Sequence, residues 1–249
     1  MKHYIISGGG SGIGRAIAQA LSSDHTVILC GRNLKNLEGT LSSLENPSRH
    51  RILTMDIRSL KGVQEAARKL PFPSLDGIIA NAGIGGANFF GPEDRWQDII
   101  ETNLSGTYYF VNSFLPMLRK SSSEYKHLTI VSSILARLGV SKYSAYCASK
   151  AGLLGLMRSW ATELAPEKIL VNAICPGWVN TDMAQSGLEE IAQGLDITQD
   201  QFYQIAMQSV PLGKMSEPEE IAELIAYVLQ QKSITGQSFD INNGAIMNS

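Results

Sequence analysis

The sequence predicts an α/β fold in one doubly wound domain, in which a parallel sheet is covered by helices on both faces. Short apolar runs alternate with longer segments of helical period along the 249 residues, and this alternation is the pattern of repeated βαβ units. The chain has no internal repeat and no Pro-, Gly- or Ser-rich linker, so residues 1–249 are expected to form a single domain. Hydrophobic residues make up 44% of the chain, which is enough to bury one full core.

The expected strands are short apolar runs bounded by turn residues, as buried strands of a parallel sheet are. They are His3–Ser7, His25–Cys30, Arg51–Asp56, Leu75–Ala80, Leu128–Ser133, Ile169–Cys175 and Ser238–Ile241. The segments between them carry apolar residues at helical spacing. The expected helices are Gly12–Leu21, a polar stretch through Leu44, Leu60–Lys69, Pro92–Arg119, Tyr143–Leu164 and Glu217–Gln230.

The stretch Asp182–Val210 interrupts this alternation with short helical fragments and contains no lysine or arginine. It is longer than a connection between a strand and a helix needs, and such insertions often cover an active site. It also leaves the carboxyl end of the sheet, where ligands bind in open α/β sheets. We therefore expect residues 182–210 to form a lid over the substrate.

Composition excludes several classes of partner. The net charge is −2, and acidic and basic residues are mixed along the chain, so no basic stripe could neutralise a nucleic acid backbone. No apolar run approaches the roughly 18 residues that cross a bilayer. Three cysteines lie far apart and four histidines show no metal-ligand spacing. We expect a cytoplasmic protein without a membrane partner, a nucleic acid partner or a metal.

A glycine-rich turn joins the first strand to the first helix. Its glycines allow backbone N–H groups to approach a pyrophosphate at the amino terminus of the helix. The spacing differs from the common G-x-G-x-x-G, so the signal depends on its position between strand and helix. The residues expected to contact a dinucleotide here are Gly8, Gly10, Ser11, Gly12, Ile13 and Gly14.

The end of the second strand favours NADP over NAD. An acidic residue about 20 positions past the glycines would bind the ribose 2′-hydroxyl of NAD, whereas an arginine accommodates a 2′-phosphate. Gly31 occupies the acidic position and is followed by Arg32 and Asn33. A guanidinium can make charge-assisted hydrogen bonds to a phosphate. A solvated loop arginine is the alternative reading of Arg32.

A tyrosine and a lysine in the helix after the fifth strand point to carbonyl chemistry. Tyr146 and Lys150 are four residues apart, which places them on one helix face. A nearby ammonium lowers the pKa of a phenol, and such a phenol can protonate a carbonyl oxygen or deprotonate an alcohol. Ser133 stands at the end of the fifth strand, where its hydroxyl could hydrogen-bond the same oxygen.

Taken together, these motifs resemble the short-chain dehydrogenase/reductase family along the whole chain. The matches run in chain order through Ser7–Gly14, Asp56-Ile57, Ala80-Asn81-Ala82-Gly83, Thr102-Asn103-Leu104, Ser132-Ser133, Tyr146–Lys150 and Pro176–Thr181. The resemblance implies a Rossmann-like domain with seven parallel strands in the order 3-2-1-4-5-6-7, and usually a homotetramer. Ser11 departs from the pattern, since many NADP-dependent members carry a basic residue there.

The resemblance also implies roles for individual residues. Asp56 and Ile57 would border the adenine, and Asn81, Ala82 and Gly83 would pack beside the cofactor. A second group would lie nearer the reaction: Asn103 holding a water in a proton relay, Lys150 also binding the nicotinamide ribose, Thr181 binding the carboxamide, and Tyr146, Pro176, Gly177 and Val179 touching the cofactor. Trp178 is expected beside the substrate with Ser133 and Tyr146, with packing under the adjacent loop as the alternative.

We therefore expect an NADP(H)-dependent oxidoreductase that interconverts a ketone and a secondary alcohol. A loose likeness of Ser141–Ala151 and Gly177–Gly213 to 3-oxoacyl and polyketide reductases favours an oxoacyl-thioester-like or polyketide-like ketone. One alternative is an NAD-linked alcohol or 3-hydroxyacid dehydrogenase, against which Arg32 argues. Another is a non-catalytic NADP-sensing or scaffold protein, although such relatives commonly lose the tyrosine or the lysine that this chain retains.

Overall fold

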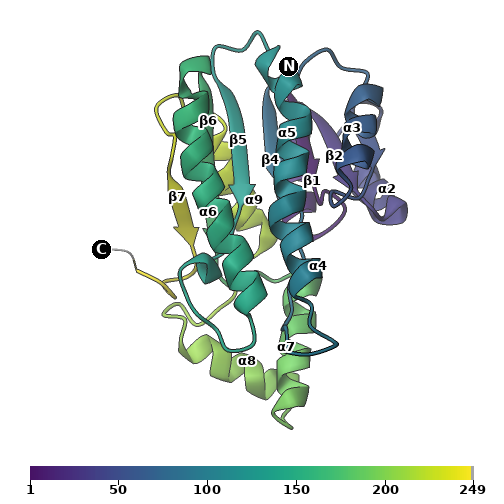
Figure 1. Cartoon of the computed structure of the whole chain (residues 1–249). Helices are drawn as coiled ribbons and strands as arrows, with labels where there is room; N and C mark the ends of the chain where they lie inside the picture. The colour runs from purple at the N-terminus through teal and green to yellow at the C-terminus, as the bar shows by residue number, and fades with distance from the viewer. Residues whose placement is uncertain (248–249) are drawn as a thin grey trace.

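The computed structural model describes residues 1–247, and over this range the chain forms one seven-stranded parallel sheet (Figure 1). The strands are β1 His3–Ser7, β2 Thr26–Gly31, β3 Arg51–Thr54, β4 Gly77–Ala80, β5 Lys126–Val131, β6 Ile169–Pro176 and β7 Ser238–Ile241. Their order is β3-β2-β1-β4-β5-β6-β7. The predicted fold class and strand order are confirmed.

Helices cover both faces of this sheet, as parallel strands require. Those on the two faces are α1 Gly12–Ser22, α2 Leu34–Ser43, α3 Leu60–Lys69, α5 Gly106–Arg119, α6 Ser144–Leu164 and α9 Pro218–Val228. In Figure 1, α5 and α6 cross in front of the strands and α9 lies behind them. The short α4, Trp96–Ile100, leads into α5, and α7, Asp182–Gly194, and α8, Gln199–Gln208, lie together at one end of the sheet.

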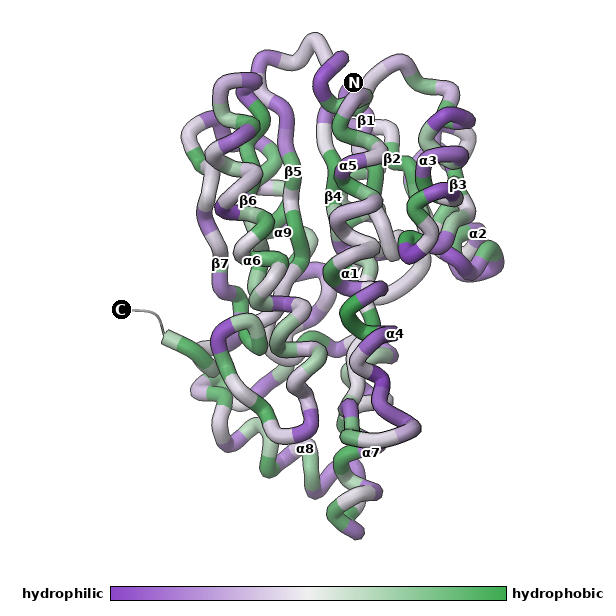
Figure 2. The backbone as a smooth tube through the Cα atoms, viewed as in Figure 1, coloured by the Kyte–Doolittle hydropathy of each residue, from purple (hydrophilic) through white to green (hydrophobic). Residues whose placement is uncertain are grey.

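Consecutive residues of a strand feed the two faces alternately, because side chains on a strand alternate with a period of two. Ile5 packs into the core under α3, α5 and α6, whereas its neighbour Ile6 packs into the core under α1 and α9. Ile78 and Ile79 of β4 divide in the same way. Figure 2 shows the resulting hydrophobic strands in the centre of the molecule. This double burial explains why the strands read as continuous apolar runs.

The long helix expected over Pro92–Arg119 is wrong in two respects. Helical structure begins only at Trp96, and a π-helical turn, Glu101–Ser105, separates α4 from α5. The side chain of Asn103 inside this turn bonds the backbone of Ile84 through its oxygen, at 2.8 Å, and through its nitrogen, at 3.0 Å. Such π-turns are frequent at functional sites, and hydrophobic periodicity does not reveal them.

The segment Asp182–Val210 is also more regular than the short fragments expected from its sequence. It forms α7 and α8, whose first residues directly follow the capping residues Thr181 and Thr198. The two helices enclose a small apolar cluster of their own, in which Leu188 and Met207 are buried. Among the described residues, no helix is both long and apolar enough to cross a membrane.

Candidate active site

The turn between β1 and α1 has a backbone that requires glycine. Gly8 and Gly12 have φ of +69° and +48°, in the left-handed region that L-residues rarely adopt. A Cβ at Gly14 would lie 2.1 Å from the carbonyl oxygen of Gly8, so no side chain fits there. A Cβ at Gly12 would lie 3.1 Å from Cγ2 of Thr181. The predicted phosphate turn therefore lies directly beside the start of α7.

Ser7 and Asn81 join this turn to the end of β4. The Ser7 hydroxyl oxygen accepts hydrogen bonds from the backbone N–H groups of Asn81 and Ala82, both at 3.0 Å. The Asn81 side chain donates to the carbonyl oxygens of Ser7, at 3.1 Å, and Gly8, at 3.3 Å. The structure thus brings the glycine turn and the predicted Asn81–Gly83 segment together at the carboxyl ends of neighbouring strands.

After β3, Asp56 lies between two arginines. The Asp56 carboxylate accepts a hydrogen bond from the Arg58 guanidinium at 2.7 Å and lies 4.0 Å from the Arg32 guanidinium. The hydrogen bonds from Arg58 hold the pKa of Asp56 below its usual value. Ile57 is buried against Gly106, and Asn33 caps α2 by accepting from the backbone of the third residue after it. Sequence reasoning found Arg32 but missed Arg58, which belongs to no recognised motif.

Tyr146 and Lys150 lie on one face of α6, as predicted. The Lys150 ammonium nitrogen is 5.5 Å from the centre of the Tyr146 ring and donates to the carbonyl oxygen of Val131 at 3.0 Å. The lysine is only 4% exposed. Because burial disfavours the charged ammonium, it lowers the pKa of Lys150 to about 8. This lysine is therefore poised to exchange a proton near neutral pH.

The expectation that Lys150 lowers the pKa of the phenol is wrong for the protein by itself. Desolvation raises the pKa of Tyr146 to about 12, and a hydrogen bond with the side chain of Ser133 opposes this shift only in part. Ser133 lies two residues beyond the end of β5 rather than within the strand. In the protein by itself the phenol is consequently protonated at neutral pH.

Asn103 is fully buried within the π-helical turn. Besides its bonds to Ile84, its amide nitrogen donates to the hydroxyl of Ser149 at 3.2 Å, and Ser149 immediately precedes Lys150. A Cβ at Gly83 would lie 3.1 Å from Oδ1 of Asn103 and 3.6 Å from the Lys150 ammonium nitrogen. The structure thus brings the predicted site residues Gly83, Asn103 and Lys150 together.

Asn88 is a further residue of the site that the sequence did not indicate. Its side-chain oxygen accepts from the backbone N–H of Ala145, at 3.0 Å, at the start of α6. Its amide nitrogen donates to Ser144 at 3.1 Å and to Asp94 at 3.2 Å. Asn88 is buried and connects the loop after β4 to the helix that carries Tyr146. No periodicity or spacing marks such a residue within a loop.

The segment after β6 closes the other side of the site. The backbone N–H of Gly177 donates to the carbonyl oxygen of Ile241 at 3.0 Å, and Val179 is buried. The Thr181 hydroxyl accepts from the backbone of Ala184 and so starts α7. Trp178 is partly buried and packs against the apolar cluster that contains Leu188 and Met207.

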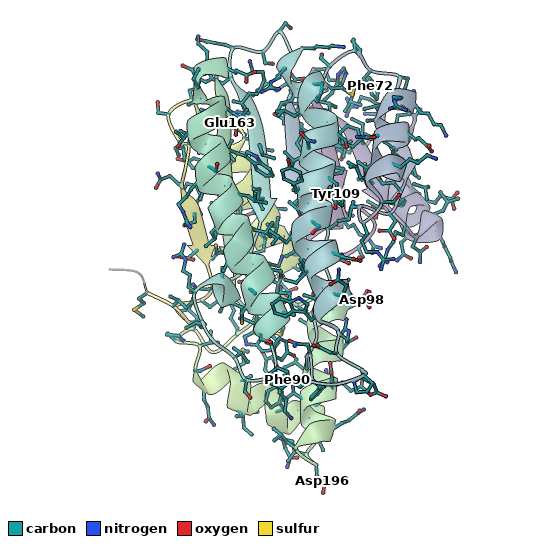
Figure 3. All side chains as sticks on the ribbon, in the orientation of Figure 1. Phe72, Phe90, Asp98, Tyr109, Glu163 and Asp196 are labelled. Carbon is teal, nitrogen blue, oxygen red and sulfur yellow. The ribbon has the colours of Figure 1, made fainter. Side chains whose placement is uncertain are left out.

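Exposed apolar side chains lie on the loop after β4 and at the start of α7. Phe89, Phe90 and Met183 are 48%, 99% and 49% exposed. Figure 3 shows Phe90 at the end of the molecule that carries α7 and α8. A Cβ at Gly85 would lie 3.3 Å from the sulfur of Met183, so this loop and α7 are adjacent. Over residues 1–247, no group of His, Cys, Asp or Glu side chains is suited to hold a metal ion.

Comparisons with known proteins agree with this geometry. The profile of the family described as short chain dehydrogenase matches residues 2–192. A ketoacyl reductase assigned to the monensin polyketide synthase in Streptomyces virginiae is 31% identical, over 96% of this chain and 95% of its own. The 3-oxoacyl-(acyl-carrier-protein) reductase of Aquifex aeolicus is 30% identical over 98% and 96%. A solved actinorhodin polyketide ketoreductase with NADPH superposes with a TM-score of 0.91 at 28% identity, covering 98% of this chain and 97% of its own.

Proposed function

The chain belongs to the short chain dehydrogenase family, and from that premise we propose that it is an NADP(H)-dependent ketoreductase. Its reaction interconverts a ketone and a secondary alcohol. The observation that carries this proposal is that Tyr146 lies next to both Ser133 and Lys150, while Lys150 lies next to Gly83 of the segment that adjoins the glycine turn. Two relatives that align over almost the whole chain are named as reductases of oxoacyl groups, which supports the same class of substrate.

The residues at the carboxyl end of the sheet fit a dinucleotide. The turn of Gly8, Gly12 and Gly14 has a tightly packed backbone that side chains would disrupt, and it leads into the amino terminus of α1, where backbone N–H groups can meet a pyrophosphate. Arg32 has a side chain that is 56% exposed, next to the cap of α2, where a 2′-phosphate would meet a guanidinium. NADPH, when bound, supplies the hydride.

Tyr146 is the proton donor of the proposed reduction. The pKa of about 12 keeps its phenol protonated at neutral pH, so the proton is available to the ketone oxygen as negative charge develops there. The Ser133 hydroxyl hydrogen-bonds and orients the same oxygen. Lys150 carries a pKa of about 8 and lies one turn away, so it can return a proton to the phenol after each turnover. In alcohol oxidation the same groups act in reverse.

We propose that the substrate is a 3-oxoacyl thioester or a polyketide-like ketone. The names of the aligned reductases support this class. The segment Asp182–Val210 contains no lysine or arginine, and apolar residues such as Met183 lie beside the loop after β4. Both features suit an uncharged acyl chain more than a polyanion. We propose further that α7 and α8 act as the cover that keeps water from the hydride.

We also propose a homotetrameric assembly in the cytoplasm. On the outer face of α5 and α6 lies an apolar hollow of about 400 Å³, lined by Leu104, Ser105, Tyr108, Tyr109, Gly152 and Leu156. Tyr108 is 43% exposed there and stacks on Trp160. A second copy of the chain would cover this surface. The three cysteines are unpaired, which suits a reducing compartment.

A substrate screen tests this function. The protein is mixed with NADPH or NADH and with a 3-oxoacyl thioester, a polyketide-like ketone or a simple ketone, and the absorbance of the reduced nicotinamide is followed. Turnover of the 3-oxoacyl thioester or the polyketide-like ketone with NADPH is expected. Activity only with NADH would indicate an NAD-linked alcohol or 3-hydroxyacid dehydrogenase instead. Cofactor binding without turnover of any ketone or alcohol would indicate a sensing protein.

A further inference from the structure

A partly buried ion pair connects the short turn after Ser133 to β7. Arg137 donates to the carboxylate of Asp240 at 2.8 Å and to the hydroxyl of Ser238 at 2.5 Å. The side chains of Arg137 and Asp240 are only 23% and 17% exposed. Ion pairs that are sheltered from solvent are screened less than exposed ones and hold their geometry better. The contact thus ties the loop after β5 to β7 at the edge of the sheet.

Ser133 and Arg137 stand at opposite ends of one short 3-10 turn, Ile134–Ala136. The Ser133 hydroxyl accepts from the backbone N–H of Leu135 at 3.1 Å. The N–H of Ala136 donates to the carbonyl oxygen of Ser133 at 3.1 Å, and the N–H of Arg137 donates to that of Ile134 at 2.9 Å. Anchoring Arg137 therefore restrains the turn as far as the Ser133 hydroxyl.

Strand β6 lies between β5, which precedes the Ser133 turn, and β7, which carries Asp240. Asp240 stands opposite Cys175 in the pairing of β7 with β6. Burial raises the pKa of the Cys175 thiol, Arg137 and Asp240 shift it in opposite directions, and hydrogen bonds with Ser132 and the backbone of Ser133 lower it. The ion pair of Arg137 and Asp240 is therefore close to the backbone of Ser133.

We propose that Arg137 is a positioning residue, which acts through Asp240 and Ser238 to hold the Ser133 hydroxyl against the substrate oxygen. The proposal rests on the proposed function, because it assigns Ser133 to the reaction. Beyond Arg137 the chain exposes Leu138 and Val140, so the ion pair anchors the turn at the point where the chain passes into solvent. A shift of about 1 Å in a reacting group can reduce a rate by about 100-fold. We therefore expect kcat to fall when this turn is no longer held in place.

The test compares Arg137→Met, Arg137→Lys and the matched control Arg119→Met. Arg119 likewise makes two side-chain hydrogen bonds, both to the Glu167 carboxylate, but this pair joins α5 to the region after α6 and is more exposed. We expect Arg137→Met to lower kcat about 10-fold with the KM for NADPH unchanged. Arg137→Lys should recover part of this loss, because one donor can still reach Asp240. The control should retain the wild-type kcat.

A double-mutant cycle separates positioning from general destabilisation. If Arg137 acts through Ser133, then Arg137→Met should add little to the loss already caused by Ser133→Ala. Losses that multiply in the double variant, or a kcat for Arg137→Met equal to that of the wild type, would overturn the proposal. Should Arg137→Met fold poorly, Ser238→Ala removes one of the two acceptors and is expected to show a smaller loss of the same kind.

Hydrogen exchange gives a readout that does not depend on knowing the substrate. The amides of Ala136, Arg137 and Leu138 donate hydrogen bonds within the turn, and they should exchange faster in Arg137→Met than in the wild type. Unchanged exchange would overturn the positioning role even if no ketone is turned over. Faster exchange in a protein that reduces no ketone would instead support the restraint of the turn while refuting the proposed reaction.

Discussion

Burial of Lys150 predicts that this lysine lowers the stability of the fold at neutral pH. The lysine is 4% exposed, and its pKa falls from the ordinary value of 10.5 to about 8. Each pKa unit corresponds to about 1.4 kcal/mol, so the charged lysine costs about 3 kcal/mol relative to its unfolded state. Since the folded pKa lies below the unfolded one, this penalty is complete below about pH 8. It is relieved as the pH rises toward about 10.5.

The assay measures the free energy of unfolding of wild-type protein and of Lys150→Met in urea, at a fixed protein concentration, from about pH 7 to about pH 10.5. Methionine does not titrate, so any change in packing that it introduces shifts the difference between the proteins without changing its slope. Relative to Lys150→Met, the wild type should gain about 3 kcal/mol over this range. Lys35→Met removes an exposed lysine and serves as the control for loss of one charge. A difference between wild type and Lys150→Met that does not vary with pH would refute the reasoning.

Three further predictions concern the cofactor, the cover and the assembly. Replacing Gly31 by Asp together with Arg32→Leu should move kcat/KM from NADP toward NAD, and a parent enzyme that already prefers NAD would refute the role of Arg32. Amides of residues 184–208 should exchange faster in the free protein than with NADP and a ketone, as measured by mass spectrometry, and equal protection would show that this segment is no cover. Tyr108→Glu should shift light scattering at micromolar concentration toward smaller species, whereas a wild-type protein that is already monomeric would refute the assembly.

The fold was predictable because its signals are local and repeated. Buried strands of a parallel sheet are apolar on both faces, so runs such as Ile78-Ile79 identify themselves. The predicted strand ends were less accurate: β3 ends at Thr54 and β5 at Val131, each two residues before the predicted end. Polar residues that follow the strands, such as Ser133, lie beyond the last hydrogen bonds between neighbouring strands.

The candidate site was predictable only where a motif sets the spacing. The Tyr146 and Lys150 pair follows from the helical period, whereas Asn88 and Arg58 act through contacts that depend on how the chain folds. The direction of the Tyr146 pKa shift was wrong for a related reason. A charge four residues away is visible in the sequence, but the burial that outweighs it is not.

The measurement that tests the central claim most directly compares wild type and Tyr146→Phe in the oxidation of NADPH driven by a ketone. Removing the phenolic proton should lower kcat by at least about 100-fold, the lower range for a general acid. The dissociation constant for NADPH, measured by fluorescence titration, should stay close to that of the wild type, because the ring remains in place on α6. Retention of full activity by Tyr146→Phe would contradict the assignment of this tyrosine as the proton donor.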